Sequence, residues 1–171
     1  MIEVEIKARI NDLENIKKKL EHNAKLKRQY NKNDVYFKKE DFIVRIREDQ
    51  QYVVTFKTKK IEDCMEVSEE NEFVIENENV FIKMLQVIGF KEYFRKVKTG
   101  AEYHTDSLNL DLSLVNNLGW FLEIEKLVEK TEDIGSAKKE IVNMLKKLNL
   151  EDDIEVRTYE QLILENKRNV L

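Results

Sequence analysis

The chain has 171 residues, of which 42% are hydrophobic and 37% are charged, and its net charge is −4 from 30 basic and 34 acidic residues. This length and composition predict a single soluble globular domain over residues 1–171, with a substantial core but an unusually high ionic content. The balance gives no general attraction to nucleic acid or to a membrane surface, so any charged site has to be local.

Cysteine and histidine are scarce in this sequence. The single Cys64 excludes an internal disulfide and a zinc site with several cysteines, and His22 and His104 are too few and too far apart to suggest a histidine metal site. There is no apolar run long enough to span a bilayer, and the sequence opens on a strand pattern rather than a signal peptide. We therefore expect a cytoplasmic protein that does not bind a membrane.

Residues 1–9 alternate apolar and charged side chains without a break, which is the period of a β-strand. One face carries Ile2, Val4, Ile6 and Ala8. The other face carries Glu3, Glu5, Lys7 and Arg9. Two acids followed by two bases suit a metal held next to an anion, and a sheet face turned to solvent is the alternative interpretation.

The segment that follows predicts one helix and four strands. Asn11 and Glu14 have the spacing of a helix N-cap and its partner, and apolar residues recur at helical spacing into the mid-twenties. The expected strands are 26–37, 42–47, 51–59 and 68–75. A charged connection is expected at 61–65, between the last two.

Helices and strands then alternate to the end of the sequence. A helix is expected over 77–88, with Gly89 in the position of a C-terminal glycine. The remaining expected strands are 90–98, one or two within 103–114, and 120–128. The last helices are expected over 136–148 and from a capping box at Thr158 and Gln161 through Leu164.

About eight strands with antiparallel hairpins and three or four helices predict an α+β fold. The helices and the strands each have an apolar face, so the helices are expected to lie on the apolar faces of the strands. The charged strand faces then turn either into a closed barrel or out to water.

The charged faces are sorted by sign, strand by strand. After the first strand, the i, i+2 pairs are Arg45 and Arg47, Lys57 and Lys59, Glu70 and Glu72, Lys96 and Lys98, Asp111 with Ser113, and Glu123 and Glu125. Like charges at this spacing repel unless a ligand or an opposite strand relieves them. Paired bases suit a polyanion such as a triphosphate, and paired carboxylates suit Mg²⁺ or Mn²⁺. The sorting therefore favours a charged site inside a barrel over a solvated face.

The ordered set of motifs resembles the CYTH family, the triphosphate tunnel metalloenzymes, which includes class IV adenylate cyclases and thiamine triphosphatases. Glu3-Val4-Glu5-Ile6-Lys7 is similar to the family's Glu-x-Glu-x-Lys opening, and residues 118–125 are similar to its Leu-Gly-x-Phe-x-Glu-x-Glu strand. Further similar segments are Asp34-Val35-Tyr36-Phe37, Val44-Arg45-Ile46-Arg47, Thr55-Phe56-Lys57, Glu70-Asn71-Glu72, Lys96-Val97-Lys98 with Tyr103, and Thr158-Tyr159 with Leu162. The resemblance covers nearly the whole chain in the right order.

The resemblance implies a closed eight-stranded antiparallel β-barrel, open at both ends, with helices packed outside. It implies Mg²⁺ or Mn²⁺ held by Glu3, Glu5, Glu123, Glu125 and Asp111. It implies phosphate binding by Arg45, Arg47, Lys57, Lys96 and Lys98, with Lys7 and Glu5 as catalytic residues. Ser113 is a departure, because cyclase-like members usually have an acid there. Either Asp111 takes over that role or the metal site has one ligand fewer.

The match is closer to the class IV cyclases, which implies conversion of ATP to cyclic AMP and pyrophosphate. Hydrolysis of inorganic or thiamine triphosphate on the same scaffold is one alternative, and a non-catalytic polyphosphate or nucleotide sensor is another. Nucleic acid is not an expected partner, because the bases are not interleaved with aromatics and the chain is acidic. A homodimer is expected only by analogy with the family.

Overall fold

The computed structural model describes residues 1–169, with the side chains of Lys59 and Asn169 outside the description. The strands are β1 (Ile2–Ile10), β2 (Lys25–Lys39), β3 (Phe42–Glu48), β4 (Tyr52–Glu62), β5 (Met65–Ile75), β6 (Lys91–His104), β7 (Asn109–Val115) and β8 (Gly119–Val128). The helices are α1 (Leu13–Asn23), α2 (Glu78–Val87), α3 (Ile134–Leu148) and α4 (Tyr159–Asn169), and 3-10 turns lie at Thr131–Asp133 and Glu151–Asp153.

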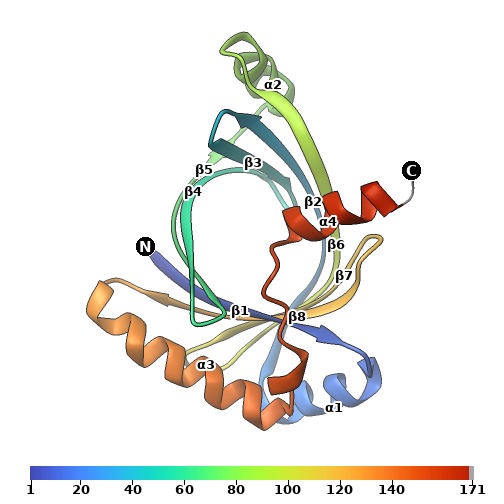
Figure 1. Ribbon diagram of the computed structural model, residues 1–171, viewed down its shortest axis with the longest axis vertical. Coiled ribbons are helices and arrows are strands. Elements are labelled where there is room, and N and C mark those ends of the chain that lie inside the picture. The colour runs from blue at the N-terminus through green and yellow to red at the C-terminus, as the bar shows by residue number, and fades with distance from the viewer. Residues whose placement is uncertain (170–171) are drawn as a thin grey trace.

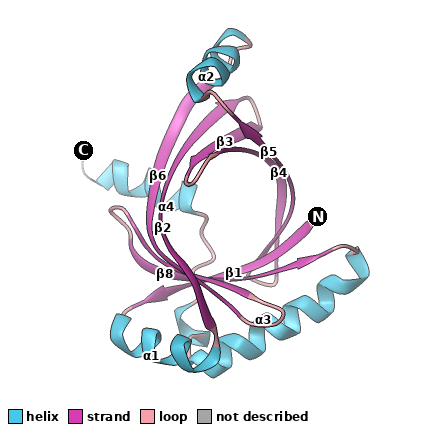
Figure 2. Ribbon diagram, turned by 180° about the vertical axis from the view of Figure 1, so that it is seen from behind, coloured by secondary structure: helices cyan, strands magenta, loops and turns pink. Residues whose placement is uncertain are grey.

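The strands form a closed antiparallel barrel in the order β1-β5-β4-β3-β2-β6-β7-β8, with β8 paired back to β1. Figures 1 and 2 show the strands curving around into a ring, with α1, α2 and α3 on its outside. This confirms the α+β fold and the closed eight-stranded barrel expected from the sequence. In such a barrel, alternate residues of every strand point inward and outward.

The main hydrophobic core lies outside the barrel wall, under α1 and α3. The apolar face of β1 packs there, and Val4 and Ile6 are buried against Ile141 and Leu145 of α3. Each such side chain stabilises the fold by roughly 1.5–3 kcal/mol relative to an exposed one. Since the apolar face of β1 is committed to this core, its charged face has to point into the barrel.

Helix α2 covers another part of the outer wall, whereas α4 packs on inward-facing residues at one end of the barrel. Helix α2 connects β5 to β6 across the strands between them, and Leu85 is buried against Val35, Ile46 and Val54. Helix α4 packs Tyr159, Leu162 and Ile163 against Phe94, Val115 and Phe121. The predicted capping box is present, because Thr158 and Gln161 exchange backbone-to-side-chain hydrogen bonds at 2.8 and 3.2 Å. No helix in the described part of the chain is long and apolar enough to cross a membrane.

The structure corrects three local predictions. The N-cap of α1 is Asp12, which accepts a hydrogen bond from the backbone N–H of Asn15, and not Asn11. Strands β4 and β5 extend across most of the connection expected at 61–65, which leaves Asp63 and Cys64 as a two-residue turn. Both have positive φ, at 52° and 64°, as hairpin turns that match strand twist require. Tyr103 belongs to β6 and not to the following strand.

Candidate active site

The inward faces of the strands enclose a cavity of about 890 Å³. Every site residue predicted from the sequence lines it, namely Glu3, Glu5, Lys7, Arg45, Arg47, Lys57, Lys96, Lys98, Asp111, Glu123 and Glu125. The predicted convergence of the charged strand faces on one cavity is therefore observed, whereas the role of each residue stays a prediction.

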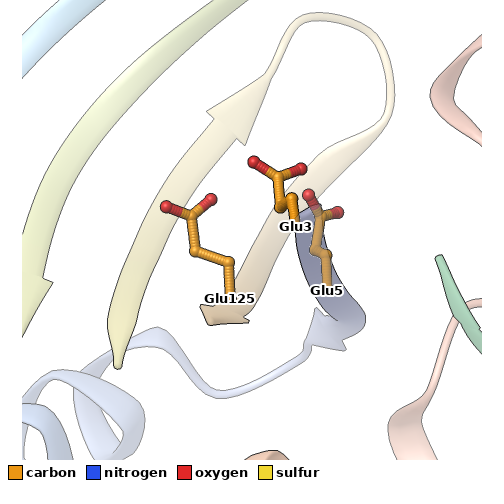
Figure 3. Close-up of side chains that lie close together, drawn as sticks. All are labelled: Glu3, Glu5 and Glu125. Carbon is orange, nitrogen blue, oxygen red and sulfur yellow. The ribbon is translucent and has the colours of Figure 1, made fainter. Parts of the chain in front are cut away.

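Three carboxylates gather at one place on the cavity wall. Glu3 and Glu5 come from β1 and Glu125 from β8, and Figure 3 shows all three side chains rising from these neighbouring strands. One oxygen from each lies within 4.8 Å of the others. Glu5 and Glu125 are direct cross-strand partners. Like charges placed opposite each other destabilise a sheet, so this arrangement calls for a compensating cation.

Proton affinities reflect the crowding of these carboxylates. Burial, then the charges of Glu125 and Glu70, raise the pKa of Glu3 to about 8. Burial and the charge of Glu123 raise the pKa of Glu5 well above its usual range. The pKa of Glu125 is raised as well, mainly by burial. Each group would bind a proton or a cation more readily than it would in water.

The donor set of these three carboxylates fits a hard divalent cation. Mg²⁺ binds carboxylate oxygens at about 2.1 Å, which brings ligands of one ion within about 4.2 Å of each other. The observed oxygens, within 4.8 Å of one another, are close to that separation. Glu3, Glu5 and Glu125 would therefore hold the metal, and Asn109 holds Glu125 in place by donating a 2.9 Å hydrogen bond to Oε1.

The other two predicted metal ligands lie beside this group but pair with a base. Glu123 and Asp111 both pair with the ammonium of Lys98, and Asp111 also accepts a hydrogen bond from the hydroxyl of Tyr30. Burial would raise the pKa of Glu123, but the ammonium of Lys98 outweighs it and holds the pKa at about 2. Both acids thus form ion pairs with Lys98, whereas Glu3, Glu5 and Glu125 form the three-carboxylate group.

The structure also shows the surroundings of Ser113, the residue at which this chain departs from the cyclase-like pattern. Ser113 is fully buried and is the cross-strand partner of Gly100 of β6. A Cβ added to Gly100 would lie 2.7 Å from the Cα of Ser113. Asp111, two residues earlier, lines the cavity. Asp111 is therefore the acid that β7 presents to the site, although its partner in this structure is Lys98.

The bases form a second group, which is organised around a buried acid. Asp34 of β2 is 1% exposed and accepts two hydrogen bonds from Arg47, at 2.7 and 2.9 Å. Lys96 of β6 lies 3.3 Å from the same carboxylate. Burial would raise the pKa of Asp34, but these two cations hold it far below its usual range. Asp34 thereby fixes the positions of two predicted phosphate-binding residues.

Two of the remaining predicted phosphate-binding residues are held by acids of β5, whereas Lys98 is held by Asp111 and Glu123. Arg45 donates hydrogen bonds to Thr55 and to Glu72, at 2.7 and 3.0 Å. Lys57 pairs with Glu66 and Glu70 at 2.8 and 2.9 Å. These bases are thus pre-positioned at the cavity wall, close enough to Glu3 to oppose part of the rise in its pKa.

Lys7 follows Glu5 on the cavity face of β1 and lies near both acids and bases. It is 8% exposed, its Nζ donates to the backbone carbonyl of Arg157 at 2.6 Å, and burial lowers its pKa. The ring of Tyr159 lies 4.4 Å from this Nζ, 4.7 Å from that of Lys96 and 5.8 Å from that of Lys98. One aromatic ring therefore lies near three ammonium groups at the α4 side of the cavity.

Several contributors were not assigned a role from the sequence. They are Asp34, Asn109, Tyr30, Lys32 and Tyr159. Lys32 links Asp111 to Glu102, at 3.5 and 2.8 Å. Asp34 and Tyr159 stand within motifs similar to family motifs, which was a usable signal. Asn109 and Tyr30 carried no such signal, because the acids they bind, Glu125 and Asp111, are distant from them in the sequence.

The comparisons with known proteins agree with this geometry. The CYTH domain profile matches residues 1–159, which is most of the chain. The chain belongs to the CYTH family. CYTH proteins act on triphosphate substrates and depend on a divalent metal, in accord with a cavity that holds both clustered carboxylates and clustered bases.

Individual relatives extend the family assignment. A Methanocaldococcus jannaschii protein with a provisional adenylate cyclase name is 31% identical over 166 residues, covering 92% of this chain and 95% of that protein. A Pyrococcus horikoshii structure is 28% identical, with a TM-score of 0.85 over 96% of this chain and 99% of that one. A Hippeastrum protein, described as a provisional adenylyl cyclase with a dominant triphosphatase activity, is 19% identical, and its structure has a TM-score of 0.57 over 86% and 88% of the two chains.

Proposed function

We propose that this CYTH protein is a metal-dependent enzyme that converts ATP to cyclic AMP and pyrophosphate. The observation that carries the proposal is the presence, in one cavity, of three converging carboxylates and a separate set of pre-positioned bases. A nucleoside triphosphate with its metal presents the matching charges, a cation for the acids and a polyanion for the bases.

The bases bind and orient the phosphates. The guanidinium groups of Arg45 and Arg47 match phosphate oxygens geometrically, and Lys57, Lys96 and Lys98 add compact charges. Each base is held by a carboxylate of the wall, so little side-chain order has to be gained when phosphate arrives. This preorganisation fixes the triphosphate along the cavity.

The three carboxylates act through the metal that they would hold, next to one phosphate of the substrate. Bound Mg²⁺ or Mn²⁺ supplies polarisation of a phosphoryl oxygen and lowers the pKa of an attacking hydroxyl. Glu3, Glu5 and Glu125 would hold that charge at one position on the β1–β8 wall. Lys7, buried beside them, places an ammonium next to the charge that develops on the phosphate oxygens.

Cyclisation requires the ribose to fold back, so that its 3′-hydroxyl lies in line with the α-phosphate. The provisional cyclase name of the archaeal relative supports this reaction. Hydrolysis is the second candidate, because a positioned water at the terminal phosphate needs the same bases and the same metal. The dominant triphosphatase activity of the Hippeastrum protein makes hydrolysis the alternative to test.

Product analysis distinguishes the two reactions. The protein is incubated with ATP, inorganic triphosphate and thiamine triphosphate, each with Mg²⁺ or Mn²⁺, and the mixtures are separated by chromatography. We expect cyclic AMP and pyrophosphate from ATP. ADP with orthophosphate, or turnover of inorganic triphosphate alone, would make the protein a triphosphatase. A Glu3→Gln/Glu5→Gln double variant, purified in parallel, controls for contaminating phosphatases.

A further inference from the structure

A second, smaller pocket of about 360 Å³ lies beside the central cavity. The loop 105–108 between β6 and β7 forms one side of it, with His104 at the end of β6. Lys27, Asn109 and Leu127 line both spaces, so the pocket adjoins the cavity. Resting on the proposed function, we propose that this pocket binds the organic group of the triphosphate substrate, a nucleoside in the case of ATP.

The pocket adjoins the carboxylates through a direct contact. Asn109 lines the pocket with one side and donates its 2.9 Å hydrogen bond to Glu125 with its amide. A group in this pocket is therefore separated from the proposed metal position by one side chain. In cyclisation, the ribose hydroxyl attacks the α-phosphate, which would lie beside the metal-holding carboxylates Glu3, Glu5 and Glu125, so the nucleoside would lie next to these residues.

The order of charges along the cavity favours the same orientation of the substrate, with its organic group toward the pocket. Along β1, the acids Glu3 and Glu5 come first and Lys7 follows, about 7 Å further than Glu5. Lys7, Lys96 and Lys98 surround Tyr159 at the far side. The terminal phosphates carry most of the negative charge of a nucleoside triphosphate. In the proposed orientation they lie on these lysines, Arg45 and Lys57 hold the phosphate nearest Glu3, and the organic end lies toward the pocket.

The pocket wall is ordered and chemically mixed. Thr105 and Leu108 exchange two 2.9 Å hydrogen bonds across the loop, and Ser107 donates to Glu140 of α3 at 2.8 Å. Leu108 is 6% exposed and Leu127 is 46% exposed, and His104 adds a flat polar ring. The lining is mostly polar, with Leu108 and Leu127 as its apolar members, and its volume lies in the range of pockets for small organic groups.

The test places the same bulky side chain at two sites: in the β6–β7 loop, beside the start of β2, and in the turn that follows the end of β2. Asp106→Trp fills the proposed pocket, and Asp41→Trp is the matched control. Both aspartates are exposed, and Asp41 lines the cavity at the turn between β2 and β3, away from the end of β2 that pairs with His104. Both variants lose one negative charge. Calorimetry with Mg²⁺ gives the Kd of α,β-methylene-ATP and of inorganic triphosphate, and melting temperatures report folding.

We expect Asp106→Trp to raise the Kd of the ATP analogue at least tenfold and that of inorganic triphosphate less than twofold, whereas Asp41→Trp changes both alike. Ser107→Trp is the replacement if Asp106→Trp melts early. An unchanged ratio of the two Kd values, or a selective effect of Asp41→Trp, overturns the inference while triphosphate binding stands. A wild-type protein that binds inorganic triphosphate but not the analogue overturns it too. Binding of neither ligand overturns the proposed function, and the inference with it.

Discussion

Arg47 of β3 donates two hydrogen bonds to the carboxylate of Asp34 on the adjacent β2, at 2.7 and 2.9 Å. The two residues are cross-strand partners in the β2–β3 ladder. A fully buried acid thereby holds the guanidinium in a two-point contact, with its plane fixed before any ligand arrives. The same carboxylate holds Lys96, so the buried charge is shared between two bases of the cavity.

Asp34→Asn tests this arrangement through stability. The substitution keeps the shape of the side chain but leaves Arg47 and Lys96 without a buried counter-charge. We expect the free energy of unfolding, measured by urea titration, to fall by about 3–5 kcal/mol. Glu92→Gln is the matched control, because the Glu92–Arg95 pair is exposed and contributes about 0–1 kcal/mol. A loss below 1 kcal/mol for Asp34→Asn would contradict a structural role for the acid.

Arg47→Ala tests the role of the guanidinium toward phosphate. Two of its nitrogens are bonded to Asp34, and the group lines the cavity. We expect the variant to bind inorganic triphosphate more weakly by about 1.5–3 kcal/mol, the value of a charge-assisted hydrogen bond. Isothermal calorimetry measures the difference. Arg95→Ala, on the exposed side of β6, is the control, and equal affinities in the two variants would place Arg47 outside the binding site.

Glu5→Gln tests the carboxylate cluster. The amide keeps the shape but removes one of two like charges that face each other across β1 and β8. We expect the metal-free protein to melt at the same or a higher temperature, since repulsion is relieved, and metal-dependent activity to fall by orders of magnitude.

The control for this variant is Glu69→Gln, an exposed acid of β5 that is paired with Ile2 in the neighbouring ladder. It should change neither property. Full activity of the wild type in excess EDTA would remove the basis for the metal assignment, whatever the behaviour of Glu5→Gln.

Glu155 gives a pH-dependent prediction away from the metal ligands. It accepts hydrogen bonds from Arg9 and Arg157, at 2.8 and 2.6 Å, and so ties the segment before α4 to β1. The hydrogen bonds from Arg157, with that from Arg9, outweigh burial and lower the pKa of Glu155 to about 2 from 4.5. Between these values the unfolded chain binds more protons, so this contribution to stability is present above about pH 4.5 and is lost as the pH falls toward 2.

Glu155→Gln should therefore destabilise the protein by about 1–2 kcal/mol at pH 7, a value reduced for the solvent exposure of Arg157. The difference from the wild type should shrink as urea titrations are repeated from pH 5 down to pH 2.5. Glu165→Gln, which loses only the exposed outer contact of Arg157, is the control. A difference that stays constant with pH would rule out the charge of Glu155 as its source.

The strand period predicted much of the fold, because each strand has one apolar and one charged face. Val4 and Ile6 pack under α3 and Glu3 and Glu5 line the cavity, as alternation requires. Turn chemistry was less informative. Asp63 and Cys64 form a tight hairpin without a glycine, so the sequence did not mark the place where β4 ends.

The pairing of charges inside the cavity was not predictable from the sequence. Glu123 and Glu125 are two residues apart on the same strand face, yet one pairs with Lys98 while the other joins Glu3 and Glu5. Which neighbour each acid meets depends on the registers of β6, β7 and β1 around the ring. Those registers are set by long-range pairing, about which local spacing carries no information.

The closure of the barrel has a consequence for how the protein opens. Each strand is hydrogen-bonded to a neighbour on both sides, so removing any strand breaks two ladders at once. Even the seven-residue β3 is held between β2 and β4. Because the closed barrel formed by the described residues has no free sheet edge, partial unfolding cannot start at one. Amide hydrogen exchange in the paired segments of all eight strands should report a single free energy, that of global unfolding.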